Sequence, residues 1–513
     1  MYITQINIMS NDSRTAQSAQ NATAALINKI VNLILSFVTR RLFIDFIGIE
    51  YLGINGLFTE ILGMLSLADL GFGSAMAYSF YKPIAENDKE KITQLITFYR
   101  KVYNVIALAI AIVGIALVPF LDVIVNVDKE IPYLQVYYLV FLANTVVSYL
   151  FVYKSSIITA SQKNYIVLKY QTWIIVAKVV LQLLAVVVTK NYLLYISVGI
   201  FTTLANNLLV SKKADELYPE IKERKELPKQ EKKEIFSNLK SVFIYKISST
   251  LLNSTDNTLM SMICGTVLVG YYANYRTITS NYNGFIAILF GSLTASIGNL
   301  VVKTSEKKRY EVFRVMQMVS FMIATFTIVE MYLLMEDFIV IWLGTDSYLL
   351  DKFTLVAILL NLYLGSTLQP LWSYREATGL YRRTRYIMLI TAIENVILSV
   401  ILGKFFGVGG IILATFVSKI TTYVWYEPVV LFKEYFNESV LKYLWENVVN
   451  IILMLVCGAI AVLCTRQFTE ISITNWIIKA FIGAVIVIIV YLIRYAKTNE
   501  FKILLQKLKI TKQ

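Results

Sequence analysis

The feature that most constrains this chain is a series of about fourteen apolar stretches, most of them long enough to cross a bilayer as a helix. Such a helix needs roughly 20 mostly apolar residues. The 513 residues are 57% hydrophobic and 16% charged, and they contain seven prolines, so the stretches can stay helical. The stretches lie near 22–44, 54–80, 102–125, 132–153, 166–189, 192–211, 237–262, 267–300, 311–334, 353–374, 386–404, 407–431, 447–465 and 473–495. We therefore predict an all-α polytopic membrane protein with about 14 transmembrane helices.

The composition excludes several kinds of chemistry. Histidine is absent, and the three cysteines, Cys264, Cys457 and Cys464, form no C-x-x-C pair, which argues against a His-based triad, a zinc knuckle or a disulfide framework. The pattern G-x-x-x-x-G-K-[ST] of a phosphate-binding loop does not occur. We expect no catalytic residues, no metal and no cofactor, and so no enzyme.

The distribution of basic residues predicts the orientation. With the N-terminus in the cytoplasm, 37 of the 48 lysines and arginines fall in inner loops, and seven fall outside. An excess of lysine and arginine marks cytoplasmic loops, so both termini are expected inside, and the net charge of +14 reflects these loops rather than nucleic-acid binding. The first twenty residues do not resemble a cleavable signal peptide, and either Met1 or Met9 can be the start.

A polar segment divides the first twelve stretches into two sets of six, and two more stretches follow. We expect a cytoplasmic N-terminal segment (1–21), an N-lobe (22–211), a cytoplasmic linker (212–236), a C-lobe (237–432), two extra helices (433–495) and a basic tail (496–513). The linker is expected to be solvated, with a docking site for a partner as the alternative. The tail is predicted to be an amphipathic helix on the inner leaflet or an ordinary solvated end.

A weak internal repeat supports two lobes. The run GIEYLG begins at Gly48 and the run GTVLVG begins at Gly265, an offset of 217 residues. Two six-helix halves related by an axis along the membrane normal are a transporter architecture, with the substrate held between them near the midplane. Chance similarity of two short turns is the alternative.

Particular motifs resemble a known family. The run GIEYLGINGLF from Gly48, the run LSLADLGFGSA from Leu65 with Tyr81-Lys-Pro after it, and GVGGIILAT from Gly407 are similar to the Wzx-type polysaccharide-transport branch of the multidrug/oligosaccharidyl-lipid/polysaccharide (MOP) exporter superfamily. The resemblance implies two six-helix lobes around a central cavity plus two C-terminal helices, in a multi-pass protein of the bacterial cytoplasmic (inner) membrane.

The same resemblance implies a flippase that works by alternating access. Its substrate would be an undecaprenyl-pyrophosphate-linked oligosaccharide for O-antigen, capsule or exopolysaccharide. Its partners would be membrane lipids, the polysaccharide polymerase machinery and a proton or sodium gradient. A cation-coupled multidrug exporter, or a cell-wall precursor flippase, of the same superfamily is the nearest alternative. A membrane-embedded glycan polymerase or glycosyltransferase is the alternative from another class, and the short outer loops argue against it.

Basic residues within the stretches are candidates for binding phosphate or sugar, because an ionisable group inside the membrane marks a pathway by default. Arg276 is the leading candidate, since it lies too deep to reach the interface easily and its guanidinium can grip phosphate. Of the adjacent Arg40 and Arg41, only one can face a cavity. The other candidates are Lys178, Lys246 and Lys419. Each of these six has an alternative role in an internal ion pair or as an interface anchor.

Three carboxylates are candidates for ion coupling or charge pairing. Under the repeat offset, Glu60 aligns beside Arg276, so the two are predicted to face each other across the cavity. Asp69 adjoins the Gly71 and Gly73 pair, and its alternative role is a helix–helix hydrogen bond. The third is Glu394. In a chain without histidine, any proton coupling must use carboxylates such as these.

Overall fold

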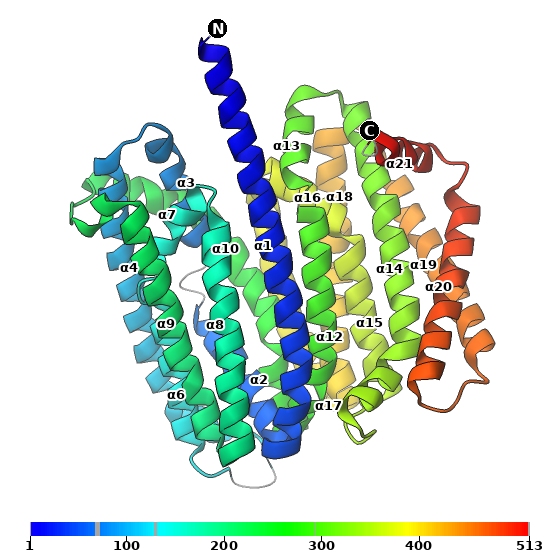
Figure 1. Cartoon of the computed structure of the whole chain (residues 1–513). Helices are drawn as coiled ribbons and strands as arrows, with labels where there is room; N and C mark the ends of the chain where they lie inside the picture. The colour runs from blue at the N-terminus through cyan, green and yellow to red at the C-terminus, as the bar shows by residue number, and fades with distance from the viewer. Residues whose placement is uncertain (1, 67–71, 128–130, 292, 511–513) are drawn as a thin grey trace. The chain divides into compact units, whose positions relative to one another are not determined.

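The computed structural model describes residues 2–66, 72–127, 131–291 and 293–510, and every regular element in these ranges is a helix (Figure 1). Each of the fourteen expected stretches falls largely within helices, which confirms the all-α prediction. In the described ranges, eight helices are long and apolar enough to cross a membrane, and the pair α15–α16, bent by 44°, adds a ninth. The total of fourteen spans stays a prediction.

Gly407 divides one long helix into two antiparallel arms. Helix α17 (Tyr381–Thr421) is interrupted at Gly407, whose φ of 59° and ψ of −141° are not helical. Thr391 on the first arm bonds Thr422 just beyond the second (2.6 Å), and the amide of Asn395 donates to Thr415 Oγ1 (2.9 Å). Pairs that converge on residue 407 define a helical hairpin, so the chain turns back on itself where the sequence predicts a break between 404 and 407.

The helices form two compact units. Unit 1 comprises Met1–Thr250 and Gly265–Gly270, and unit 2 comprises Leu251–Cys264 and Tyr271–Gln513. Within unit 1, α8 packs against α1 and α9, and α6 packs between α4 and α9. The helices that begin in unit 1 are α1 (Tyr2–Ile47), α2 (Ile49–Leu65), α3 (Phe72–Ala85), α4 (Lys89–Ala116), α5 (Leu121–Ile124), α6 (Leu134–Tyr149), α7 (Ser155–Ala160), α8 (Asn164–Leu184), α9 (Tyr192–Leu217), α10 (Lys229–Ser254) and α12 (Thr266–Gly291).

In unit 2 the packing centre is α14, which is longer than every other helix of the unit except the interrupted α17. It contacts α15, α19 and α20, which lie around it in Figure 1. The remaining helices are α11 (Asp256–Cys264), α13 (Thr294–Lys303), α14 (Glu306–Leu343), α15 (Lys352–Thr367), α16 (Gln369–Thr378), α18 (Tyr423–Leu431), α19 (Val440–Thr465), α20 (Ile473–Tyr495) and α21 (Asn499–Ile510).

The two copies of the repeat contact each other reciprocally. Gly48 and Gly265 have φ angles of 108° and 100°, which L side chains rarely adopt, and each immediately precedes a helix, α2 or α12. A Cβ on Gly53 would lie 2.1 Å from the carbonyl oxygen of Thr266, and a Cβ on Gly270 would lie 2.5 Å from that of Ile49. Each contact maps onto the other under the 217-residue offset, as a two-fold relation requires.

The segment 212–236 contacts the rest of unit 1 through a few buried residues and several ion pairs. Ile221 and Leu227 are buried, and Thr93 on α4 donates to the carbonyl of Glu220 (3.1 Å). Three ion pairs link residues 225–231 to α4, namely Lys225–Glu90 (3.3 Å), Lys91–Glu231 and Lys101–Glu226, and Lys232–Glu226 (3.1 Å) closes within the segment. The side chains of 222–226 and 228–230 are exposed, while Ile221 and Leu227 hold the segment on the rest of unit 1. The solvated linker therefore stays a prediction.

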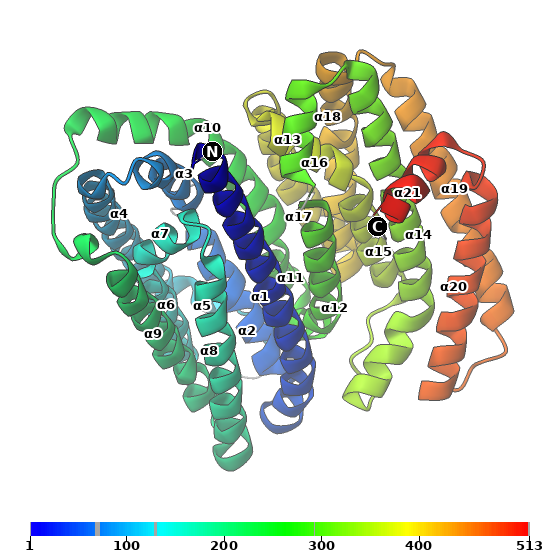
Figure 2. The same cartoon turned by 45° about the horizontal axis from the view of Figure 1, so that its top comes forward.

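The C-terminal helix α21 packs on unit 2. Phe501 and Leu504 lie against an apolar cluster of α14, α19 and α20, and Glu500 accepts an ion pair from Arg314 of α14 (2.9 Å). Figure 2 shows α21 beside α14. The apolar face that suggested a helix on the lipid surface is thus used, at these positions, for packing within the protein.

Candidate functional site

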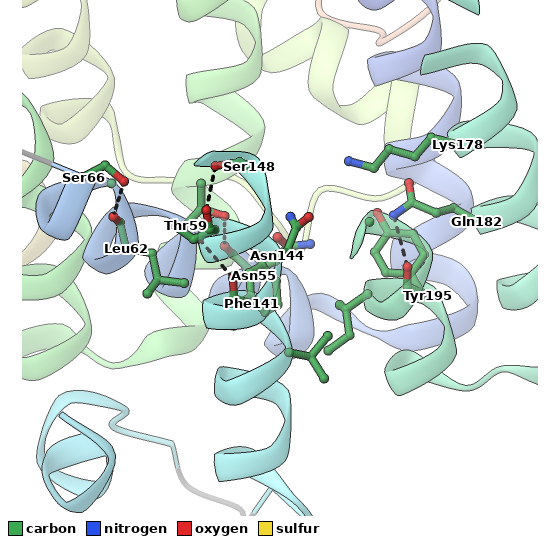
Figure 3. A pocket seen from close by; sticks show the side chains of 15 residues that line it. Asn55, Thr59, Leu62, Ser66, Phe141, Asn144, Ser148, Lys178, Gln182 and Tyr195 are labelled. Carbon is green, nitrogen blue, oxygen red and sulfur yellow. Dashed lines mark hydrogen bonds between the residues drawn. The ribbon is translucent and has the colours of Figure 1, made fainter. Parts of the chain in front are cut away.

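Unit 1 contains a polar cavity of about 460 Å³ among apolar helices. Its walls come from α2, α6, α8 and α9 (Figure 3). The lining is rich in amides and hydroxyls: Asn55, Thr59, Ser66, Asn144, Thr145, Ser148, Gln182 and Tyr195. A volume of this size lies in the range of small-molecule sites, and the neutral polar groups can exchange hydrogen bonds with hydroxyl-rich ligands.

Several of the lining groups are held in place by the helices that carry them. Asn144 on α6 accepts a hydrogen bond from Thr203 Oγ1 of α9 (2.9 Å). Gln182 on α8 donates to the carbonyl oxygen of Tyr195 (3.1 Å), which joins α8 to α9 at the cavity wall. These bonds leave the walls preorganised, because side chains of neighbouring helices fix one another.

Lys178 is the one basic residue among the residues that line this cavity. It lies on α8, one turn before Gln182, and Figure 3 shows its ammonium extending into the space across from Asn144. The described residues give this ammonium neither an ion pair nor a hydrogen bond, in contrast to Lys154, which pairs with Asp215 at 2.7 Å. An unpaired cation in a membrane-embedded cavity can bind an anionic or hydroxyl-bearing ligand.

The adjacent arginines of α1 have different surroundings. Arg41 is half-exposed and lies 3.8 Å from Asp45, one turn further along the helix. Arg40 is more buried and interacts electrostatically with Tyr195, a residue that also lines the cavity. Neighbouring helical positions diverge by about 100°, which explains why only one of the pair turns inward.

Lys419 belongs to a polar cluster in unit 2. Its ammonium lies 3.4 Å from Asn361 Oδ1 of α15 and interacts electrostatically with Asp256 of α11. Asp256 lies 3.4 Å from the hydroxyl of Thr415, on the same arm of α17 as Lys419. Internal pairing, the alternative role for Lys419, accounts for this geometry.

The other candidates are more dispersed. Glu394 accepts a hydrogen bond from Thr421 (2.6 Å) across the α17 hairpin. Glu60 is 5% exposed on α2 in unit 1, and Arg276 is half-buried on α12 in unit 2. The predicted facing of Glu60 and Arg276 stays a prediction. Lys246 falls on α10, but its side chain lies outside the described residues, as does all of Asp69.

Sequence reasoning missed three charged features of unit 2. Arg375 and Glu427 form a buried ion pair of 2.7 Å, with side chains 9% and 6% exposed, although Arg375 lies just beyond the expected stretch 353–374. Lys479 of α20 pairs with Asp337 of α14 at 2.6 Å. Glu330, in the middle of α14, is also buried. A count of acids inside apolar stretches would have found Glu330 and Glu427, since each interrupts such a run.

Comparisons with solved structures identify the fold. The lipid II flippase MurJ, in an inward closed conformation, matches with a TM-score of 0.67 at 15% identity, over 93% of this chain and 98% of that one. An inward-facing multidrug resistance MATE family transporter of the MOP superfamily matches with a TM-score of 0.59 at 14% identity, over 77% and 93%. A MOP superfamily transporter from Pyrococcus furiosus, described as having a binding pocket of reversed polarity, matches with a TM-score of 0.52 at 14% identity, over 82% and 95%.

The class of protein follows from this fold: the chain is a multi-pass membrane protein with the MOP-superfamily transporter fold. A comparison with curated protein sequences finds no match. The family described as polysaccharide biosynthesis protein matches residues 18–294, more than half of the chain. The chain belongs to this polysaccharide biosynthesis family, and the resemblance noted from its motifs is confirmed.

Proposed function

We propose that this protein is a flippase that moves an undecaprenyl-pyrophosphate-linked oligosaccharide from the inner to the outer leaflet of the bacterial cytoplasmic membrane. The product would feed the synthesis of a surface polysaccharide such as O-antigen, capsule or exopolysaccharide. The family and the fold support a transporter of this kind. No covalent chemistry is needed, because the lipid tail can remain in the bilayer while the polar head crosses.

The observation that carries the proposal is the polar cavity around Lys178. A head of sugars and phosphate offers many hydroxyls and at least one anionic group, and it must lose water to enter the membrane. The cavity replaces that water with amides and hydroxyls, and the unpaired ammonium of Lys178 can meet an anion. An apolar drug would gain little from such a lining, since it would leave the polar groups unpaired.

Other parts of the predicted site belong to this proposal. Arg276, Arg40 or Arg41, Lys246 and Lys419 would add basic groups along the path, and Glu60, Asp69 and Glu394 would couple transport to a proton or sodium gradient. Both termini would lie in the cytoplasm, next to the polymerase machinery and the enzymes that assemble the substrate.

The test is translocation of a defined lipid-linked oligosaccharide by the full chain in proteoliposomes. Lys178→Gln should lower the rate roughly ten- to hundredfold, the range that corresponds to losing a hydrogen bond to a charged group. Lys178→Arg should keep part of it. Lys169→Gln is the matched control, because Lys169 lies on the same helix but is exposed. Equal rates for Lys178→Gln and Lys169→Gln would contradict the role of the cavity.

The same assay separates the alternatives. Lipid II should move more slowly than the oligosaccharide if the cavity selects a larger sugar head, and faster movement of lipid II would favour a cell-wall precursor flippase. Lengthening of the glycan in the same vesicles, without added enzymes, would instead identify a polymerase.

A further inference from the structure

Helix α14 carries a carboxyl group in the middle of its apolar length. Glu330 is 9% exposed, and neither carboxylate oxygen has a hydrogen-bond partner or is accessible to solvent. Buried polar groups nearly always have partners, and a charged group inside a membrane protein is functional by default. Apolar packing alone therefore does not explain why a carboxyl group occupies this position.

The protein leaves room for this carboxyl group. Glu330 faces Gly483 of α20, and a Cβ at that position would lie 2.6 Å from Glu330 Oε1. The neighbouring Leu333, Val329 and Val487 belong to, or pack on, the apolar cluster between α14, α19 and α20. The carboxyl group thus sits in a seam between α14 and α20, beside Gly483 and apolar side chains.

The charged groups on the surrounding helices are already paired. On α20, Lys479 lies one turn before Gly483, and its ammonium is bound to Asp337. Tyr491, two turns after Gly483, bonds the hydroxyl of Thr325 (2.5 Å). On α19 the buried thiol of Cys457 lies in the same apolar cluster as Val329 and Val487, while Glu446 of α19 and Glu500 of α21 both bind Arg314.

More distant charges are also occupied. Arg314 precedes Glu330 by sixteen residues, or roughly 24 Å along α14 at 1.5 Å per residue. Lys352, at the start of α15, pairs with Glu336. Arg375 of α16 pairs with Glu427 of α18. Among the described residues, no cation is therefore bonded to Glu330, and Arg494, the other cation on α20, lies eleven residues beyond Gly483, or roughly 16 Å along the helix.

We propose that Glu330 is a proton-binding site in the seam between α14 and α20. An ionised carboxylate with no partner in apolar surroundings is strongly unfavourable, so the neutral acid is the form that this packing accepts. A metal cation would need several oxygen ligands, and the described residues form no cluster of carboxyl groups around Glu330. When the seam opens to water, Glu330 releases one proton to it and becomes a carboxylate, and closing the seam takes one proton up.

This inference goes beyond the proposed function, because it concerns helix packing in unit 2 rather than the substrate cavity in unit 1. A proton bound here would couple the packing of α20 to pH, whatever the protein transports. Failure of the flippase assay would leave it intact, and failure of the proton assay would leave the flippase proposal intact.

Infrared spectroscopy of the full chain in nanodiscs tests the proposal. Exposed carboxyl groups ionise near pH 4, so at about pH 6 a remaining acid C=O band reports buried, protonated groups. Glu330→Gln should remove one acid band, and the apolar Glu330→Met should do the same if the first variant folds poorly. Glu427→Gln is the matched control, since Glu427 is equally buried but ion-paired with Arg375, and it should leave the band in place.

Two outcomes would overturn the assignment. One is an acid region at about pH 6 that is identical in the wild type and both Glu330 variants. The other is loss of the wild-type band on adding sodium chloride at constant pH, which would identify a metal cation as the ligand. A band that disappears with Glu330 alone and is insensitive to sodium supports the proton site.

Discussion

The close contact between the two repeat copies, at Gly53 and Gly270, offers the sharpest test of the fold. Substituting Gly53 by alanine places a methyl group against the backbone of the start of α12, where the carbonyl oxygen of Thr266 lies 2.1 Å from the new Cβ position. Ordinary van der Waals contact for a Cβ is 3.4–4 Å. The obstacle is main chain within a helix, so no side chain can rotate away, and the two segments must separate by more than 1 Å at this point.

The expected loss of stability has two parts. Overpacking of a well-packed contact costs about 1–3 kcal/mol, and exchange of glycine for alanine in a helix regains about 0.5–1 kcal/mol. We therefore expect Gly53→Ala to lose about 1–2 kcal/mol. Gly270→Ala, whose Cβ would meet the carbonyl of Ile49 at 2.5 Å, should lose a similar amount because the contact is reciprocal.

Gly63→Ala is the matched control on the same helix. A Cβ at Gly63 meets nothing within 4 Å, so this substitution should be neutral or should gain about 0.5–1 kcal/mol. Thermal unfolding of purified protein in detergent measures the difference, at about 2–4 °C for each kcal/mol. A Gly53→Ala variant as stable as Gly63→Ala would refute the close crossing and remove the physical support for the repeat.

Three further predictions concern packing and charge. Arg375→Met should lower the free energy of unfolding by about 3–5 kcal/mol by leaving Glu427 buried and uncompensated, and adding Glu427→Leu should restore most of it in a double-mutant cycle. Gly407→Ala should lose about 1–3 kcal/mol in thermal unfolding, because φ 59° and ψ −141° suit glycine. Hydrogen bonds from Lys101 and Lys232 lower the pKa of Glu226, so these bonds persist at pH above the ordinary carboxyl pKa and are lost as the pH falls through the lowered pKa. Limited proteolysis of the linker should therefore become faster over that fall in pH. In Glu226→Gln the proteolysis rate should not change over the same pH range.

Much of the fold was accessible from sequence because the bilayer imposes strong rules. Apolar stretches of sufficient length predicted the helices, and the break between 404 and 407 predicted the hairpin that Gly407 makes. The glycines at 48 and 265 also carried information, since both occupy backbone conformations that other residues avoid. In each case the structural feature is predicted from a short part of the chain, without knowledge of its neighbours in space.

The packing of polar segments was not accessible in this way. The linker contains many lysines and glutamates, a composition typical of solvated chain, yet Glu226 and Glu231 bind lysines that precede them by more than a hundred residues. The amphipathic tail likewise has a face that suits a lipid surface and a protein surface equally well. The composition of a segment shows which kinds of surface it can pack on. Which surface it does pack on depends on the helices that lie next to it.

The buried charges show why position alone does not identify a functional residue. Depth within an apolar stretch selected Lys178 and Lys419 equally, but Lys419 lies among Asn361, Asp256 and Thr415, while Lys178 faces a cavity without a charged partner. The same distinction separates Glu427, which is bound to Arg375, from Glu330, which is bound to nothing described here. A paired charge stabilises one arrangement of helices. An unpaired charge is unfavourable until something binds it, and it therefore makes the helices around it respond to a ligand, which we infer to be a glycan head at Lys178 and a proton at Glu330.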